Sequence, residues 1–435
     1  MQTTQLTAPR RHDIDALRVF AFALLILYHA SGIWQADSTF HAASRHGWEH
    51  MDALRIVFNR WRMPLIFAVS GIAIGMAASR PGWGFAARRS WRLLLPLVFG
   101  MLTTVAVQAW AEARLRGTVD SGFLAFWWRY LELQPWPAGT FSGAEHGVTW
   151  NHLWYLPYLW CYTMLLLVLM PLLDSPPVRR VRGWFGRGGA FTAWLLPVLA
   201  WLAALLWLRP RFPESHALVG DWYAHAVYFS CFLGGWLIAR EQAAWAWLVR
   251  WRWRTAGVAF VSIGIELALK LSDLWLGNGA LPPWALEVDW GLVERAARAA
   301  YGWSALLAIL GFAHRWLDRP FPWLPYANEA VYPWYILHQT LLVLIGYWVL
   351  PLGWSAGAEV FAILGGTIAG CALLHELLIR RLRWLRPLFG LKPAAGAPRS
   401  AAPHRRRASH PGPAGTRSAA AVAGGFHPSR RNASR

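Results

Sequence analysis

The stretch DIDALRVFAFALLILYHASGIW, residues 13–34, decides the fold class. Its apolar run from Ile14 to Trp34 matches the roughly 20 residues that a helix needs to cross the hydrocarbon core of a bilayer. The core of a signal peptide is shorter and is followed by a small-residue cleavage site, which is not evident here. We therefore expect a permanent transmembrane helix at the start of the chain.

Nine more apolar runs of comparable length follow. Hydrophobic residues make up 56% of the 435 residues and charged residues only 15%, whereas a soluble domain carries about a quarter charged residues. The composition and the runs predict an all-α, polytopic membrane bundle of about ten transmembrane helices. The expected spans lie near 14–34, 63–79, 93–111, 152–173, 191–208, 222–239, 256–275, 292–312, 330–350 and 358–379.

The loops between these runs predict an orientation. If the N-terminus is cytoplasmic, the inward segments contain sixteen arginines and the outward segments nine. Arg55, Arg60 and Arg62 are among those assigned to an outward loop. Because cytoplasmic loops are enriched in Lys and Arg, both termini are expected in the cytoplasm.

The strong positive charge, +20, does not indicate nucleic acid, because the arginines alternate with apolar runs of membrane length. Residues 391–435 differ from the rest and are rich in Ala, Pro, Gly and Arg. They are expected to form a disordered basic cytoplasmic tail after a membrane domain at 1–390. Three cysteines fall inside expected helices without metal-ligand or disulfide spacing, so no metal site is expected.

The first span contains two residues of functional interest. Arg18 and His29 are eleven positions apart, so they point within roughly 20° of each other and are separated by roughly 16 Å along the helix axis. A histidine deep in a membrane is a candidate functional residue. The residue type alone also allows a histidine that only hydrogen-bonds neighbouring helices.

Two arginines open the third span in RRSWRLLLPLVFG, residues 88–100. Arg89 and Arg92 are three positions apart and share a helix face, where two guanidiniums can bind phosphate oxygens. Taken alone, the pair is better explained as ordinary topology charge.

Further candidates lie in NHLWYLPYLW, residues 151–160, and in the ninth span. His152 and Trp154 stand at the outer edge of the fourth span, where a tryptophan can also be a simple interfacial anchor. His338 lies inside the ninth span, about one turn after Tyr335.

In two i,i+4 pairs the opposite charges are expected to neutralise each other. These pairs are Glu266 with Lys270 and Glu376 with Arg380.

At these residues the sequence resembles acyltransferase family 3 of bacterial membrane proteins, over about residues 11–386, and most closely its glucan-modifying, succinyltransferase-like branch. The family's Arg-x10-His signature falls on Arg18 and His29, and its Arg-x-x-Arg signature falls on Arg89 and Arg92. The stretches WRMPLIFAVSG, HLWYLPYL and YILHQT resemble family segments in the same order. The resemblance implies a ten-helix bundle with both termini inside. It also implies transfer of an acyl group from acyl-CoA to a hydroxyl of a carbohydrate, glucan or related cell-envelope acceptor.

The resemblance and the helix geometry together suggest roles. Arg89, Arg92 and Arg18 would bind the phosphates of coenzyme A, the donor substrate, and no permanently bound cofactor is expected. His29 would act as general base, although an acyl-histidine intermediate is also chemically reasonable. Donors to a developing oxyanion would come from His338, Tyr335 and His152, which the sequence does not rank. His152, Trp154 and Tyr335 are the candidates for substrate binding.

The principal rival is a proton-coupled transporter or flippase of an envelope precursor, with His29 and Glu266 as proton relays. Such proteins typically contain internal repeats with broken helices, and no convincing repeat is present. A third interpretation, a non-catalytic membrane scaffold, does not explain why a histidine, His29, lies within the bilayer. The sequence therefore favours a membrane O-acyltransferase, with an acyl group of the acetyl or succinyl class.

Overall fold

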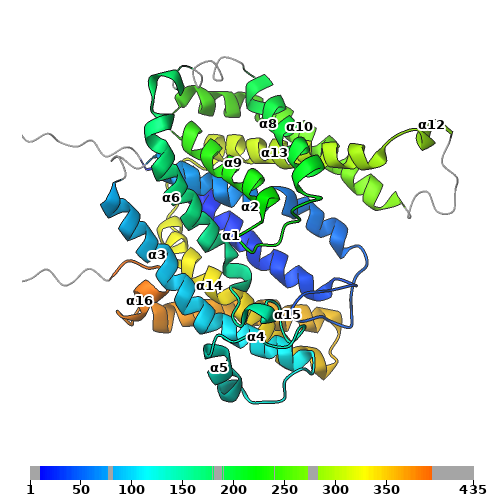
Figure 1. Ribbon diagram of the computed structural model, residues 1–435, viewed down its shortest axis with the longest axis vertical. Helices are drawn as coiled ribbons and strands as arrows, with labels where there is room; N and C mark the ends of the chain where they lie inside the picture. Colours follow the sequence, from blue (N-terminus) through cyan, green and yellow to red (C-terminus); the bar gives the residue numbers. More distant parts are fainter. Residues whose placement is uncertain are drawn as a thin grey trace, which may run out of the picture. The chain divides into compact units, whose positions relative to one another are not determined.

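A computed structural model describes residues 10–76, 82–178, 180, 189, 191–239, 241–272 and 283–393. Throughout these ranges the regular elements are helices, and the only strand-like feature is an isolated bridge between Gln35 and Trp48 (Figure 1). The predicted all-α bundle is confirmed. The predicted tail falls outside the described residues from position 394 onward.

The helices follow one another with short connections. The α-helices are α1 (His12–Ser31), α2 (Met51–Gly75), α3 (Trp83–Leu102), α4 (Thr104–Leu115), α5 (Phe123–Leu131), α6 (Tyr155–Leu173), α8 (Leu196–Ala203), α9 (Trp222–Ile238), α10 (Gln242–Lys270), α12 (Pro283–Leu286), α13 (Trp290–Trp316), α14 (Leu324–Val349), α15 (Ala356–Leu374) and α16 (Leu385–Leu388). Shorter 3-10 or π segments are η1 (Gly32–Trp34), η2 (Ala144–His146), η3 (Asn151–Trp154), η4 (Phe191–Leu195), η5 (Ala204–Leu208), η6 (Leu350–Leu352) and η7 (His375–Ile379).

Seven helical stretches in the described ranges are long and apolar enough to cross a membrane. They are His12–Trp34, Trp83–Leu115, Asn151–Leu173, Phe191–Leu208, Trp290–Trp316, Leu324–Leu352 and Ala356–Ile379. Each coincides with one of the ten predicted spans, and the remaining three predictions fall on α2, α9 and α10. The chain is a multi-pass membrane protein.

The predicted starts of three spans are too late, and one of them is the span at 93–111, where α3 begins at Trp83. α2 begins at Met51, twelve positions before the predicted span at 63–79, and α10 begins at Gln242, before the predicted span at 256–275. Apolar-run reasoning stops at charged residues, but a helix continues through them when the protein supplies partners. Arg55, Arg60 and Arg62 therefore belong to α2 rather than to a loop, and their predicted outward side stays a prediction.

Small residues bring α2 and α9 into close contact. A Cβ atom added at Gly71 would lie 1.9 Å from the carbonyl oxygen of Phe232, and one added at Gly235 would lie 2.2 Å from that of Ala68. Only glycine permits such an approach between helix backbones. The packing fixes α2, which carries several of the residues described below.

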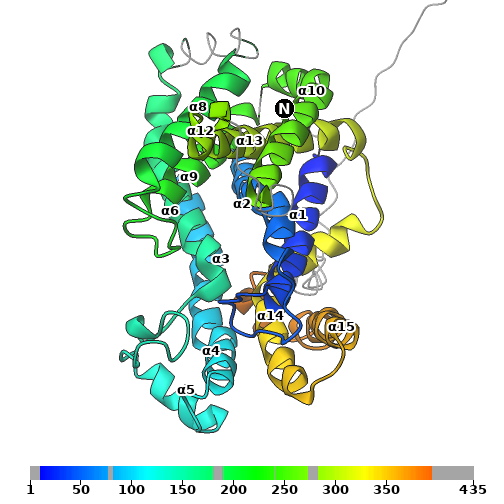
Figure 2. The ribbon, with the colours of Figure 1, turned by 90° about the vertical axis from the view of Figure 1, so that its right-hand side faces the viewer.

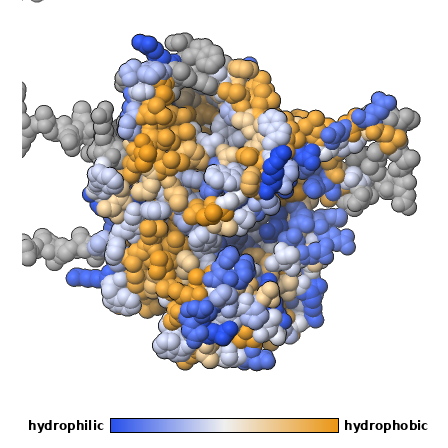
Figure 3. Space-filling model, in the orientation of Figure 1, coloured by the Kyte–Doolittle hydropathy of each residue, from blue (hydrophilic) through white to orange (hydrophobic). Residues whose placement is uncertain are grey.

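Helices α1 and α14 pack against each other, and α14 also contacts α4 and α15 (Figure 2). α1 contacts α2 on another side, so residues of α1, α2 and α14 can face one interior space. Apolar side chains gather on the surface over α3 and α6 (Figure 3). Val98, Leu165, Val168 and Leu172 are among the exposed apolar residues of these two helices.

Candidate active site

His29 of α1 lies beside His338 of α14. The Nδ1 atom of His29 is 3.0 Å from Nε2 of His338, and the two rings are stacked with centroids 5.1 Å apart. His338 is completely buried. The two helices therefore bring together a pair of histidines that are 309 positions apart in the chain.

The hydrogen bonds assign the tautomers of this pair. Nδ1 of His338 faces the carbonyl oxygens of Tyr335, at 2.8 Å, and Trp334, at 3.1 Å. Carbonyls only accept, so this nitrogen carries a hydrogen, and Nε2 of neutral His338 is an acceptor. Nδ1 of His29 must then donate, which leaves Nε2 of His29 with a free lone pair. His338 thus orients His29 as a base.

A third histidine completes the cluster. His152 of η3 donates from Nε2 to the carbonyl oxygen of Ile336 at 3.2 Å, and its ring centroid lies 5.0 Å from that of His338. The hydroxyl of Tyr335 donates to the carbonyl oxygen of His152 at 2.6 Å. Both side chains are therefore engaged with backbone carbonyls, which makes them positioning groups in this arrangement.

A buried polar network supports His152 from the side of α4. Nε2 of Gln108 is 3.3 Å from Nδ1 of His152, and Oε1 of Gln108 accepts from Gln339. Gln339 in turn contacts His41, whose other ring nitrogen is 2.6 Å from Glu112. Sequence reasoning did not select Gln108, Gln339, His41 or Glu112, because their spacing follows no motif.

His29 and His152 line a cavity with about 280 Å³ of empty space. Arg62, Trp154 and Tyr335 also line it. We call it the histidine cavity; its complete lining is Phe22, Leu25, His29, Arg62, Met63, Ile66, His152, Trp154, Tyr155 and Tyr335. The residues predicted for substrate binding, His152, Trp154 and Tyr335, all lie on its wall.

Arg62 is the second feature that the sequence analysis missed. Its side chain is 5% exposed and lies over the ring of Tyr28 at 3.4 Å. Its Nε and Nη1 atoms are buried without a hydrogen-bond partner, and no ion pair involving Arg62 is found among the described residues. An uncompensated buried guanidinium is costly and suggests an anionic partner. The signal was present in the family-like stretch WRMPLIFAVSG, which contains Arg62.

The three predicted donor-binding arginines come together at one end of the bundle. Arg89 and Arg92 stand in the first half of α3 and Arg18 in the first half of α1, and the charges of Arg92 and Arg18 both act on Arg89. The hydroxyl of Tyr332, near the start of α14, donates to the carbonyl oxygen of Arg92 at 3.3 Å. The buried Nε atom of Arg89 has no partner. We call these three residues the arginine end.

Of the two predicted neutralising pairs, one is confirmed and one is wrong. Nη1 of Arg380 lies 3.0 Å from Glu376. Glu266, however, is completely buried and pairs with Arg60 of α2, whereas Lys270 is exposed. Because α10 packs beside α2, the guanidinium of Arg60 lies inside the protein next to Glu266. Lys270, four positions along α10, is exposed and does not pair with Glu266.

One group in the described ranges has the arrangement of metal ligands. Asp13, His314 and Asp318 bring their ligand atoms within 4.8 Å of one another. The guanidinium of Arg11 already occupies this group, with Nε 2.8 Å from Oδ1 of Asp13 and Nη2 3.1 Å from Nδ1 of His314. The cation there is thus supplied by the chain itself.

Comparison with known proteins identifies the family. The model of the acyltransferase 3 family, described as an acyltransferase domain, matches residues 11–376. Searches of the curated proteins and of the solved structures gave no match. The matched range contains every element that builds the histidine cavity and the arginine end. The chain therefore belongs to acyltransferase family 3 and is a membrane enzyme that transfers acyl groups.

Proposed function

We propose that this enzyme moves an acyl group of the acetyl or succinyl class from cytoplasmic acyl-CoA to a hydroxyl of a carbohydrate, glucan or related cell-envelope acceptor. The observation that carries the proposal is the free Nε2 lone pair of His29. His29 lines the histidine cavity and is oriented by His338 through a 3.0 Å hydrogen bond. A base held in this way is suited to remove a proton from an alcohol.

The donor enters at the arginine end. Arg89, Arg92 and Arg18 bind the phosphates of coenzyme A, because guanidinium groups match phosphate oxygens in charge and geometry. Arg18 and His29 stand on one helix, roughly 16 Å apart along its axis. The flexible arm of the donor spans this distance and places the thioester near His29.

The transfer then proceeds in balanced steps. Nε2 of His29 takes the proton of the acceptor hydroxyl while the oxygen attacks the thioester carbonyl. The resulting oxyanion is stabilised by the guanidinium of Arg62, whose buried nitrogens have no other partner. When the carbon–sulfur bond breaks, the imidazolium returns its proton to the thiolate. The products are an ester and free coenzyme A, and His29 regains its lone pair.

The transporter alternative receives less support. It relied on Glu266 as a proton relay, but this carboxylate is held in an ion pair with Arg60. A relay group must exchange hydrogen-bond partners during the cycle, whereas Oε1 of Glu266 accepts two hydrogen bonds from the guanidinium of Arg60. The arrangement fits a structural ion pair better.

A direct test uses the purified protein. Thioester consumption should be followed with acetyl-, succinyl- and longer acyl-CoA in the presence of neutral oligosaccharides. We expect acceptor-dependent release of free coenzyme A with at least one short donor. Absence of thioester consumption with every donor and acceptor combination would contradict the proposal.

We also propose that both termini are cytoplasmic, in a bacterial inner membrane. The arginine excess of alternate segments motivates this orientation, which places the arginine end on the side where acyl-CoA is made. A reporter protein that works only in the cytoplasm, fused after residue 435, should be active. Activity restricted to the opposite side would reverse the topology and remove the donor route.

A further inference from the structure

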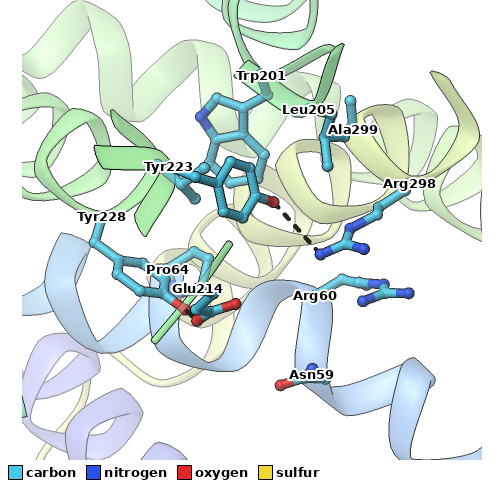
Figure 4. Close-up of a pocket in the computed structure, with 11 residues that line it drawn as sticks. Asn59, Arg60, Pro64, Trp201, Leu205, Glu214, Tyr223, Tyr228, Arg298 and Ala299 are labelled. Carbon is cyan, nitrogen blue, oxygen red and sulfur yellow. Dashed lines mark hydrogen bonds between the residues drawn. The ribbon is translucent and has the colours of Figure 1, made fainter. Parts of the chain in front are cut away.

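A second cavity lies among α2, α9, α13 and the segment that precedes α9, and its volume of about 490 Å³ includes space open to solvent. Glu214, Tyr223 and Arg298 are among its lining residues (Figure 4). We call it the Glu214–Arg298 cavity; its complete lining is Asn59, Arg60, Pro64, Trp201, Leu205, Glu214, Tyr223, Val227, Tyr228, Arg298 and Ala299. None of these residues was selected as a binding residue from the sequence.

Opposite charges face each other across this space without forming an ion pair. Figure 4 shows Glu214 and Tyr228 on one side and Arg298 and Arg60 on the other. The charge of Arg298 acts on Glu214, yet no carboxylate among the described residues pairs with Arg298. Its one hydrogen bond in the described structure is a long one, 3.4 Å to the hydroxyl of Tyr223. The two charged groups leave a gap that polar ligand groups can bridge.

Glu214 is oriented by its own neighbours. Its Oε1 atom accepts from the hydroxyl of Tyr228 and from Nε2 of His216 at 3.0 Å, which leaves Oε2 available. The side chain of Glu214 is 29% exposed, and its partial burial raises its pKa, but the hydrogen bond and charge of His216 hold the pKa at about 2. The carboxylate therefore stays ionised at neutral pH and acts only as an acceptor.

The cavity shares a wall with the histidine cavity. Trp154 lines the histidine cavity, stacks on His216 with centroids 3.9 Å apart, and lies 5.6 Å from the ring of Tyr228. Along α2, Arg62 faces the histidine cavity and Arg60, about half a turn earlier, faces the second cavity. The charge of Glu214 also acts on Arg62, so a ligand held beside Glu214 would lie near the histidine cavity.

We infer that the Glu214–Arg298 cavity binds the acyl acceptor as a neutral, polyhydroxylated sugar unit, an inference that rests on the proposed function. A carboxylate acceptor opposite guanidinium donors matches neighbouring hydroxyls, and the rings of Tyr223 and Trp201 offer apolar surface to a sugar face. The ionised Glu214 disfavours an anionic head group, because like charges placed together repel. The polar lining disfavours a lipid tail.

The first test measures binding without turnover. The full-length protein is placed in lipid nanodiscs, because maltoside detergents would present a competing sugar. Saturation-transfer NMR then measures binding of α- and β-linked glucose disaccharides, with glucose 1-phosphate as the anionic probe. We expect saturation transfer to the neutral sugars and its loss in Arg298→Gln and Glu214→Gln. The signal should persist in His29→Gln, where no acyl transfer is expected.

Arg295→Gln provides a matched control, since Arg295 stands on the same helix three positions earlier and does not line the cavity. In steady-state assays, Arg298→Gln and Glu214→Gln should raise the acceptor KM about tenfold and leave the donor KM unchanged. An unchanged donor KM also shows that these variants are folded. The control should leave both constants unchanged.

The outcomes separate the two proposals. If neutral sugars give no saturation transfer, if Arg298→Gln and Glu214→Gln do not reduce it, or if the sugar phosphate binds more tightly, the inference about this cavity is overturned. If no thioester is consumed but sugar binding depends on Arg298 and Glu214, the cavity assignment stands and the proposed acyl transfer fails.

Discussion

The two ends of this bundle both contain arginines, but only one end places carboxylates beside them. At the arginine end, Arg89 and Arg92 have no carboxylate partner among the described residues, and Arg18 has only Asp15 at 3.5 Å. At the opposite end, Arg60 pairs with Glu266, and Glu214 faces Arg298. Uncompensated cations suit a polyanion, whereas balanced charges suit a neutral polar molecule. The difference supports a donor and an acceptor that approach His29 from opposite ends.

Removing the base between the two ends should have the largest effect. His29→Gln should reduce acyl transfer by at least the 10²- to 10⁴-fold typical of general-base catalysis, and His29→Ala should do the same. An amide keeps hydrogen bonding but cannot accept the proton. Donor and acceptor binding should survive in both variants, because the base acts in the transition state. Substantial transfer by His29→Gln at normal protein levels would assign His29 a structural role and direct attention to His152 or His338.

Substitution of Arg62 tests whether the histidine cavity, between the two ends, stabilises the oxyanion. Arg62→Gln should lower kcat by about 10²- to 10³-fold, as expected for loss of an oxyanion donor, with little change in donor KM. Arg62→Lys should recover part of the loss. Arg55→Gln is a matched control, since Arg55 lies over the same Tyr28 ring, at 4.3 Å, without lining the histidine cavity. Normal kcat in a folded Arg62→Gln enzyme would rule out the assigned role.

Substitutions at the arginine end should change the donor KM alone. Arg89→Ala and Arg92→Ala should each raise the donor KM about tenfold, because each removes charge-assisted hydrogen bonds to phosphate. Lysine should rescue only partly, since an ammonium group cannot form two parallel hydrogen bonds. Titration of acyl-CoA at saturating acceptor measures the effect. If both alanine variants retain the normal donor KM, the pair is only a topology signal.

The smallest predicted effect is that of ionic strength, which should change the donor KM more than the acceptor KM. Between about 0.05 and 0.5 M salt, the donor KM should rise severalfold, because salt screens attraction between exposed cations and a polyanion. The acceptor KM should change by less than about twofold, since no net charge attracts a neutral sugar. Measuring both constants across one salt series provides the comparison. Equal responses would contradict the contrast between the ends.

The sequence by itself determined the class of fold and the candidates on single helices. Apolar run length predicts membrane helices because the bilayer sets the required length, and seven of the ten expected spans meet that criterion in the structure. The spacing of Arg18 and His29, and of Arg89 and Arg92, is readable because helix geometry relates positions along one helix. The family match at residues 11–376 agrees with the resemblance seen in those segments.

The tertiary structure decided which groups meet across helices. The partner of His29 lies 309 positions away, the partner of Glu266 lies on α2 rather than one turn along α10, and the burial of Arg62 without a hydrogen-bond partner depends on the helices packed around α2. Such contacts depend on helix–helix packing, including the glycine contacts between α2 and α9, which leave no periodic trace in the sequence. The spacing of residues along a helix is local, whereas the tautomer of a histidine depends on whichever acceptor another helix places beside it.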